Sequence, residues 1–235
     1  MKQNILYILL GIFLLASCRQ EELPGEESRY GYLSLKSVVA EVENVNAPAS
    51  RALPAVDAKD LYVEVWEGEK KVLSYASGEE VPAQIKLPVG TYTAKAYNEA
   101  YSDNAADQPM FCGESEAFTV AEGEQTQQTV SVSLHNCGIT FALSEGFKKY
   151  FSEEETSVEI TCGESTVTFS ADQFGTDNYV YFLCEEGTQP AYTLTSKNAD
   201  EETVSLSGDL DVKNGTCYTL TFNFQPDGAV SAVSE

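Results

Sequence analysis

Residues 87–96 read Leu87-Pro88-Val89-Gly90-Thr91-Tyr92-Thr93-Ala94-Lys95-Ala96. Gly90 suits a tight turn, because glycine adopts backbone conformations that strain other residues. After this turn, Tyr92, Ala94 and Ala96 alternate with polar residues, which is typical of a strand with one face in a hydrophobic core. The stretch therefore predicts a turn followed by a half-buried β-strand.

Similar short alternating runs continue on both sides of this stretch, and glycine-containing turns such as Glu67-Gly68 separate them. Only Glu145–Glu155 has the apolar spacing of a helix. The expected strands are Gly31–Val42, Leu61–Trp66, Lys71–Tyr75, Ile85–Val89, Thr91–Ala96, Phe118–Val120, Val130–Leu134, Val158–Cys162, Val167–Phe169, Val180–Cys184, Val204–Val212, Thr216–Phe224 and Ala229–Val233. This density of strands predicts an all-β, sandwich-like protein.

The chain has 235 residues, and a β-sandwich takes roughly 100. We therefore expect two tandem β-sandwich domains, residues 30–134 and 135–235, because one set of strands ends near Leu134 and another begins after Cys137. A single extended sandwich is the alternative interpretation.

The N-terminus has the pattern of an export signal. A basic Lys2 precedes an apolar run, Ile5–Ala16, which is shorter than the roughly 20 residues of a membrane-spanning helix. The run ends in Leu15-Ala16-Ser17-Cys18, which resembles a bacterial lipobox. This resemblance implies that residues 1–17 are a signal peptide, cut between Ser17 and Cys18, and that acyl chains such as palmitate attach Cys18 to a membrane. An ordinary secretory signal is the alternative.

Residues 18–29 are acidic and contain Pro24 and Gly25, so they are expected to form an extended tether. The tether resembles the acidic signal that directs some Bacteroidales lipoproteins to the outer face of the outer membrane. We therefore expect a lipid-anchored protein on the cell surface, with a plain solvated linker as the alternative.

Composition excludes several classes of function. With 14 Lys and Arg against 37 Asp and Glu, the formal charge of −23 argues against nucleic-acid binding. A single histidine, His135, excludes a His-rich metal site and leaves little basis for a catalytic triad. The many carboxylates cluster in turns, where they are usually solvated. We expect no enzyme activity, no cofactor and no metal.

Five cysteines remain besides Cys18, and none form a C-x-x-C motif. They are Cys112, Cys137, Cys162, Cys184 and Cys217. Their odd number leaves at least one unpaired, and their positions in or beside strands favour buried thiols. Export would permit disulfides, so their pairing stays open.

The L-P-x-G-x-Y pattern from Leu87 to Tyr92 is similar to the turn and strand of transthyretin-like sandwiches, which include the fimbrillin-like proteins of Bacteroidales. Together with the lipobox, the acidic tether, the strand after Gly31 and the segment Asn136–Phe141, it makes the chain resemble an uncharacterised Bacteroidales family of lipoproteins with a domain of unknown function.

The resemblance implies a mechanism of assembly. In fimbrillin pili an Arg-specific protease cuts a loop after the first strand, and a strand from another subunit fills the groove that remains. Here the expected loop, Glu43–Pro54, contains Arg51-Ala52, so Arg51 is the candidate processing site. Arg29 is a second candidate, and an ordinary loop arginine is the alternative. The last two strands could be donors to another subunit, although we expect them to close the second sandwich.

Three aromatic residues form a second candidate site. Tyr62, Trp66 and Tyr97 fall on the face opposite the predicted core. Such a face could stack on sugar rings or contact a protein, unless another sheet or domain covers it. The sequence thus favours a pilus component or adhesin that assembles with pilus subunits by strand addition. The alternative is a surface lipoprotein that binds a glycan or a host protein without polymerising.

Overall fold

The computed structural model describes residues 29–40, 43–45, 53–175, 178–185, 187–224 and 230–233, and it confirms an all-β fold. The elements are β1 Tyr30–Val39, β2 Glu43–Val45, η1 Ala58–Asp60, β3 Tyr62–Glu67, β4 Lys70–Tyr75, β5 Ile85–Pro88, β6 Gly90–Tyr97, α1 Glu99–Ser102, β7 Phe111–Glu114, β8 Phe118–Val120, β9 Gln125–Leu134, β10 Cys137–Leu143, α2 Glu145–Lys148, β11 Ser157–Cys162, β12 Ser165–Phe169, η2 Ala171–Gln173, β13 Val180–Phe182, β14 Ala191–Lys197, β15 Thr203–Asp209, β16 Thr216–Phe224 and β17 Val230–Val233.

The first half of the chain forms an eight-stranded sheet in the order β4-β3-β6-β7-β9-β1-β5, with β8 paired to β6. Its alternating apolar side chains meet in one hydrophobic cluster, as the period of two requires. The fully buried members include Leu33, Val65, Tyr92, Ala94 and Val132. In the strand after Gly90, Tyr92 and Ala94 enter this core, as the alternation predicts. Gly90 itself is the first residue of β6, and the predicted tight turn there is replaced by a bend at Val89.

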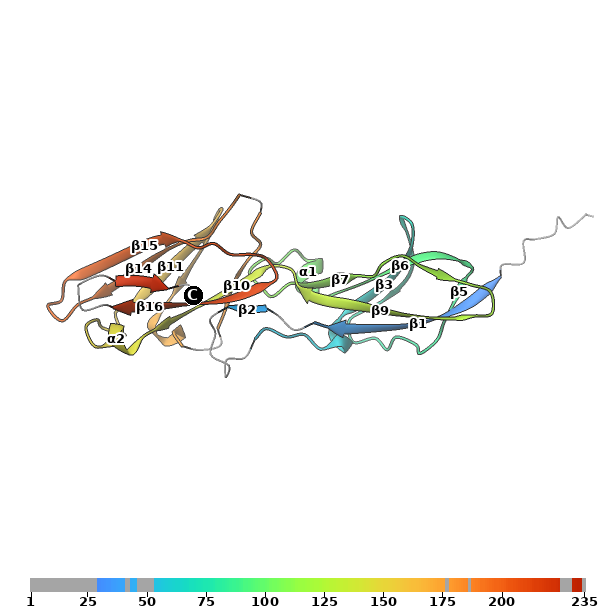
Figure 1. Ribbon diagram of the computed structural model, residues 1–235, viewed down its shortest axis with the longest axis horizontal. Coiled ribbons are helices and arrows are strands. Elements are labelled where there is room, and N and C mark those ends of the chain that lie inside the picture. The colour runs from blue at the N-terminus through green and yellow to red at the C-terminus, as the bar shows by residue number, and fades with distance from the viewer. Residues whose placement is uncertain are drawn as a thin grey trace, which may run out of the picture.

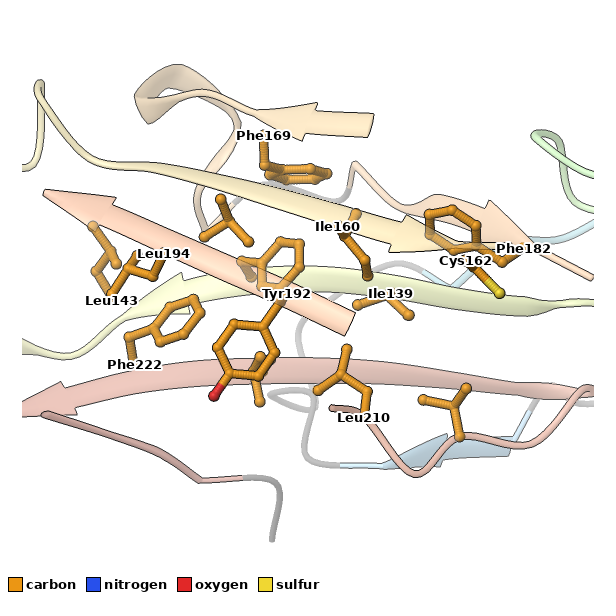
Figure 2. Packing of buried hydrophobic residues seen from close by; sticks show 14 of the residues in the cluster. Ile139, Leu143, Ile160, Cys162, Phe169, Phe182, Tyr192, Leu194, Leu210 and Phe222 are labelled. Carbon is orange, nitrogen blue, oxygen red and sulfur yellow. The ribbon is translucent and has the colours of Figure 1, made fainter. Parts of the chain in front are cut away.

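The second half forms two sheets that pack face to face. One has the order β13-β10-β16-β17 with β2 also on β16, and the other has the order β12-β11-β14-β15. Figure 2 shows Ile160, Phe169 and Tyr192 of the second sheet against Ile139 and Phe222 of the first. The two groups of strands, one from each half, lie end to end along the long axis of the molecule (Figure 1). Their division into domains at residue 134 stays a prediction.

A buried asparagine joins the two halves. The Asn136 side chain is fully buried, and its Oδ1 accepts a hydrogen bond from the Met110 amide. Its Nδ2 donates to the carbonyl oxygens of Ala106 and Gln108, and its own carbonyl oxygen accepts from the Gly215 amide. Because every one of these groups is paired, the connection between β9 and β10 is held to both halves.

Several local expectations need correction. The predicted helix at Glu145–Glu155 is only α2, which Ser144 caps by accepting from the Phe147 amide. Strand β1 ends at Val39, and the expected loop at Glu43–Pro54 begins with β2, whose main chain pairs with β16. The alternation of apolar and polar side chains does not indicate this pairing. The expected strands also omit β7, β10 and β14, and the helix α1 was not predicted.

Within the described ranges, no helix is long and apolar enough to cross a membrane. The same residues contain no group of three or more His, Cys, Asp and Glu side chains with the geometry of a metal site.

Candidate functional site

The aromatic residues predicted from the sequence lie on the outer face of β3 and β6. Leu61, Val63 and Val65 point into the core, so the intervening side chains point outward. Tyr62 and Tyr97 are directly opposite each other, and their rings stack with centroids 5.5 Å apart and planes 12° from parallel. Both side chains are half-buried.

Two residues that the sequence analysis did not assign to this site extend the row. The Tyr101 ring lies 5.9 Å from the Tyr97 ring and 5.0 Å from the His135 ring, which it meets edge-on. Tyr101 belongs to α1, which begins after Asn98 because the Asn98 side chain accepts from the Tyr101 amide. An Asn-x-x-Tyr turn after the strand is the only sequence signal that could have indicated it. We call Tyr62, Tyr97, Tyr101 and His135 the aromatic row.

A buried carboxylate lies beside the aromatic row. Glu64 is only 5% exposed. Its Oε1 accepts hydrogen bonds from Lys71 Nζ and Tyr97 Oη, each at 2.8 Å, and its Oε2 accepts from Trp66 Nε1 at 2.9 Å. Burial by itself raises the Glu64 pKa, but these three donors together lower that pKa below its ordinary value. Burial and the bond to Glu64 raise the pKa of Tyr97 to about 12.

The third predicted aromatic, Trp66, is placed between two ammonium groups. Lys71 Nζ lies 5.8 Å from the centroid of its ring and Lys95 Nζ lies 5.4 Å from it. The structure thus brings Tyr62 and Tyr97 into contact, and Glu64 links Trp66 to Tyr97. Flat rings and two ammonium groups on one face can together contact a sugar or a protein partner, whereas the buried Glu64 holds Trp66, Lys71 and Tyr97 in place.

We expect Glu64→Gln to lower the free energy of unfolding by about 2 kcal/mol at pH 7, because a neutral amide cannot accept from three donors at once. The folded-state pKa of Glu64 is lowered, so its contribution is fully present above the unfolded value and is lost as pH falls through the folded value. Urea unfolding at pH 7 and pH 3 should therefore show a smaller difference from wild type at pH 3 than at pH 7. Glu114→Gln is the control, because Glu114 is exposed and pairs with Lys95 at 3.4 Å; it should change stability by less than about 0.5 kcal/mol.

The first strand is the second candidate site. Strand β1 lies between β9 and β5, and its residues Tyr32–Val39 run parallel to Gln125–Val132 of β9 (Figure 1). Leu33 is fully buried, whereas Leu35 is only half-buried and borders a cavity of about 300 Å³ between β1 and Leu61. The strand is therefore tightly packed at its start and loosely packed towards its end.

The chain continues from β1 into the sheets of the second half. Strand β2 pairs with residues 216–218 of β16, and β17 pairs with residues 221–224 on the remainder of that strand. The last strand thus pairs within the second half, as expected. Ser17, Cys18, the rest of the tether to residue 28, Arg51 and Ala52 lie outside the described residues.

All five remaining cysteines are free thiols, and the interpretation favoured from the sequence, that these thiols are buried, holds for three of them. Cys137, Cys162 and Cys217 are buried, while Cys112 and Cys184 are half-buried.

Comparison with known proteins gives one family match. The model of the family described as "Domain of unknown function (DUF4493)" matches residues 29–233. No curated protein matches the chain.

Solved structures show similar folds at low sequence identity. A fimbrial assembly protein from Parabacteroides distasonis is 10% identical, with a TM-score of 0.46 over 87% of this chain and 98% of that one. A candidate cell adhesion protein from Bacteroides eggerthii is 12% identical, with a TM-score of 0.45 over 88% and 91%. A candidate adhesin from Bacteroides thetaiotaomicron is 13% identical, with a TM-score of 0.44 over 86% and 94%.

Proposed function

This chain belongs to the family of domains of unknown function DUF4493, and we propose that it is a lipid-anchored surface adhesin or pilus component whose first strand is exchanged for that of another subunit. In this proposal the chain is exported, cut before Cys18 and acylated there. It is displayed on the outer face of the outer membrane by its acidic tether.

The position of β1 and β2 is the observation that supports strand exchange. One continuous segment contributes a strand to the N-terminal sheet and another to β16. Cleavage after Arg51 would separate both strands from the rest of the chain. Loss of β1 and β2 would leave unpaired main-chain groups on β9, β5 and β16. It would also empty the space in the apolar core that the Leu33 side chain fills. Such edges bind an added strand through main-chain hydrogen bonds and side-chain pockets.

Processing at Arg51 is tested by N-terminal sequencing and intact mass of the protein recovered from the host surface. We expect assembled material to begin at Ala52, and we expect Arg51→Ala to leave only unassembled chains that begin at the acylated Cys18. Arg29→Ala is the matched control, because cleavage there would keep β1 in place. Assembled protein that still begins at Cys18 would contradict cleavage and leave an anchored adhesin.

The aromatic row supports a second candidate function, which is binding of a glycan or a host protein without polymerisation. Tyr62 and Tyr101 present half-buried or exposed rings on one face, as sugar-stacking surfaces do. We expect a glycan that binds in an array screen to quench the fluorescence of Trp66. Tyr62→Ala should weaken the binding of that glycan roughly tenfold. Tyr150→Ala, which removes an exposed ring of the second half, should leave the binding unchanged. Equal binding by both variants would exclude this face.

A further inference from the structure

Three of the five free thiols meet at one end of the hydrophobic core between the two sheets of the second half. Cys137 is the first residue of β10, Cys162 is the last residue of β11, and Cys184 follows β13 by two residues. The Sγ atom of Cys184 lies 3.5 Å from that of Cys137 and 3.9 Å from that of Cys162. These residues come from both sheets, and Figure 2 shows Cys162 beside Phe182 of β13.

Side-chain hydrogen bonds from elsewhere hold Cys184 in this position. Asn214 pairs with both main-chain polar groups of Cys184, because its Oδ1 accepts from the Cys184 amide at 3.1 Å and its Nδ2 donates to the Cys184 carbonyl oxygen at 2.9 Å. The Cys137 thiol donates to the Phe182 carbonyl oxygen at 3.3 Å in the adjacent strand. The main chain of Cys184 is therefore held by Asn214, and the thiol of Cys137 is held by its own hydrogen bond.

A cavity open to solvent borders this group of thiols at Cys162. A cavity of about 360 Å³ is lined by Cys162, Leu183 and Glu185, which are close to Cys184 in space or in sequence. Cys184 is itself half-buried, while Cys137 is fully buried behind it. Glu164 and Glu185 on the cavity wall favour neutral reagents over anionic ones.

We propose that Cys137 and Cys184 form a disulfide when the chain meets a small-molecule or protein disulfide as oxidant, with Cys162 left as a thiol beside it. The Sγ atoms are 3.5 Å apart and need to approach to about 2.0 Å to form the bond. A metal site is a poor alternative, because the described His, Cys, Asp and Glu side chains form no group with metal-binding geometry.

The chemistry takes two exchange steps. The thiolate of Cys184, the half-buried member of the pair, attacks the oxidant RSSR, forms a mixed disulfide with one RS group and releases the other as RSH after it takes up the proton. The Cys137 thiolate then attacks Cys184 Sγ and releases the second RSH. Two protein thiols are oxidised to one disulfide, and one RSSR is reduced to two RSH. Cys184 is the only thiol close to both of the others, so it is the shared partner.

The environment of Cys184 predicts slow oxidation near neutral pH. The hydrogen bond with Cys137 and then burial raise the pKa of Cys184, and burial raises the pKa of Cys162 to about 11. Only thiolates react, so the rate should rise about tenfold for each pH unit between pH 7 and pH 9.

Tryptic mapping distinguishes the possible pairs. Cys137 lies in the peptide of residues 96–148, whereas Cys162 and Cys184 share the peptide of residues 150–197. The full chain in detergent is treated with bis(2-hydroxyethyl) disulfide, remaining thiols are alkylated, and the digest is analysed by mass. We expect the two peptides to become cross-linked, and Cys112→Ser to leave this product unchanged although Cys112 shares the first peptide.

Serine variants of the three thiols identify which two form the disulfide. Cys162→Ser should still give the cross-linked peptides, whereas Cys137→Ser and Cys184→Ser should not. The oxidised wild type should melt about 10 °C above the reduced protein, since the bridge closes a loop across the second half. A loop link within residues 150–197, or alkylation of all of Cys112, Cys137, Cys162, Cys184 and Cys217 after oxidation of the folded wild type, would overturn the proposal. Neither result bears on strand exchange, because this chemistry requires neither Arg51 nor the lipid.

Discussion

Replacement of Leu33 with aspartate is expected to detach β1 and to unfold the N-terminal hydrophobic cluster. The Leu33 side chain is fully buried in a strand that is paired on both sides, so the variant loses about 2 kcal/mol of apolar burial and places a carboxylate in the core. The total loss should exceed about 4 kcal/mol, which is a large share of the stability of a typical domain. Urea unfolding followed by Trp66 fluorescence measures it, because Trp66 lies in the same sheet.

Val38→Asp is the matched control on the same strand. Val38 is 40% exposed, so a carboxylate there stays solvated and should lower stability by less than about 0.5 kcal/mol. If Leu33→Asp unfolded at the same urea concentration as Val38→Asp, β1 would not be part of the core in solution.

Gly113→Ala is expected to disrupt the pairing of β7 with its neighbours and to remove several kcal/mol of stability. A Cβ at Gly113 would overlap the main-chain carbonyl oxygen of Ser131, and that oxygen belongs to β9 and cannot rotate away. The main chains of β7 and β9 must therefore separate, at a cost of roughly 3 kcal/mol or more. Thermal unfolding should show the loss as a decrease of about 10 °C.

Gly123→Ala separates this steric effect from the general cost of replacing glycine. Gly123 has a φ of +69°, which favours glycine, but nothing lies within 4 Å of an added Cβ. We expect a loss of about 1 kcal/mol there, from the left-handed backbone conformation alone. Equal losses in the two variants would show that β7 does not approach β9 as closely as in the structure.

The sequence indicated the strands and their buried faces more completely than it indicated the sites. Period-two alternation correctly assigned Leu61, Val63 and Val65 to the core, and this placed Tyr62 and Trp66 on the other face. Glu64 was missed because its partner Tyr97 is 33 residues away, in another strand. From the sequence alone, a glutamate between two outward-facing aromatic residues is expected to be solvated. Its burial follows only from its neighbours across the sheet, which the sequence does not identify.

The sequence by itself determined that the protein is all-β, that a strand follows Gly90 and which side chains of the recognised strands enter the cores, because each of these depends on residues a few positions apart. The tertiary structure decided that β1 runs parallel to β9, that β2 joins the second half, that Glu64 is buried among three donors, and that Cys184 meets Cys137 and Cys162. An alternating pattern determines which face of a strand is buried, but not which strand becomes its neighbour. The choice of neighbour depends on main-chain pairing over long separations, and every strand offers the same main-chain groups.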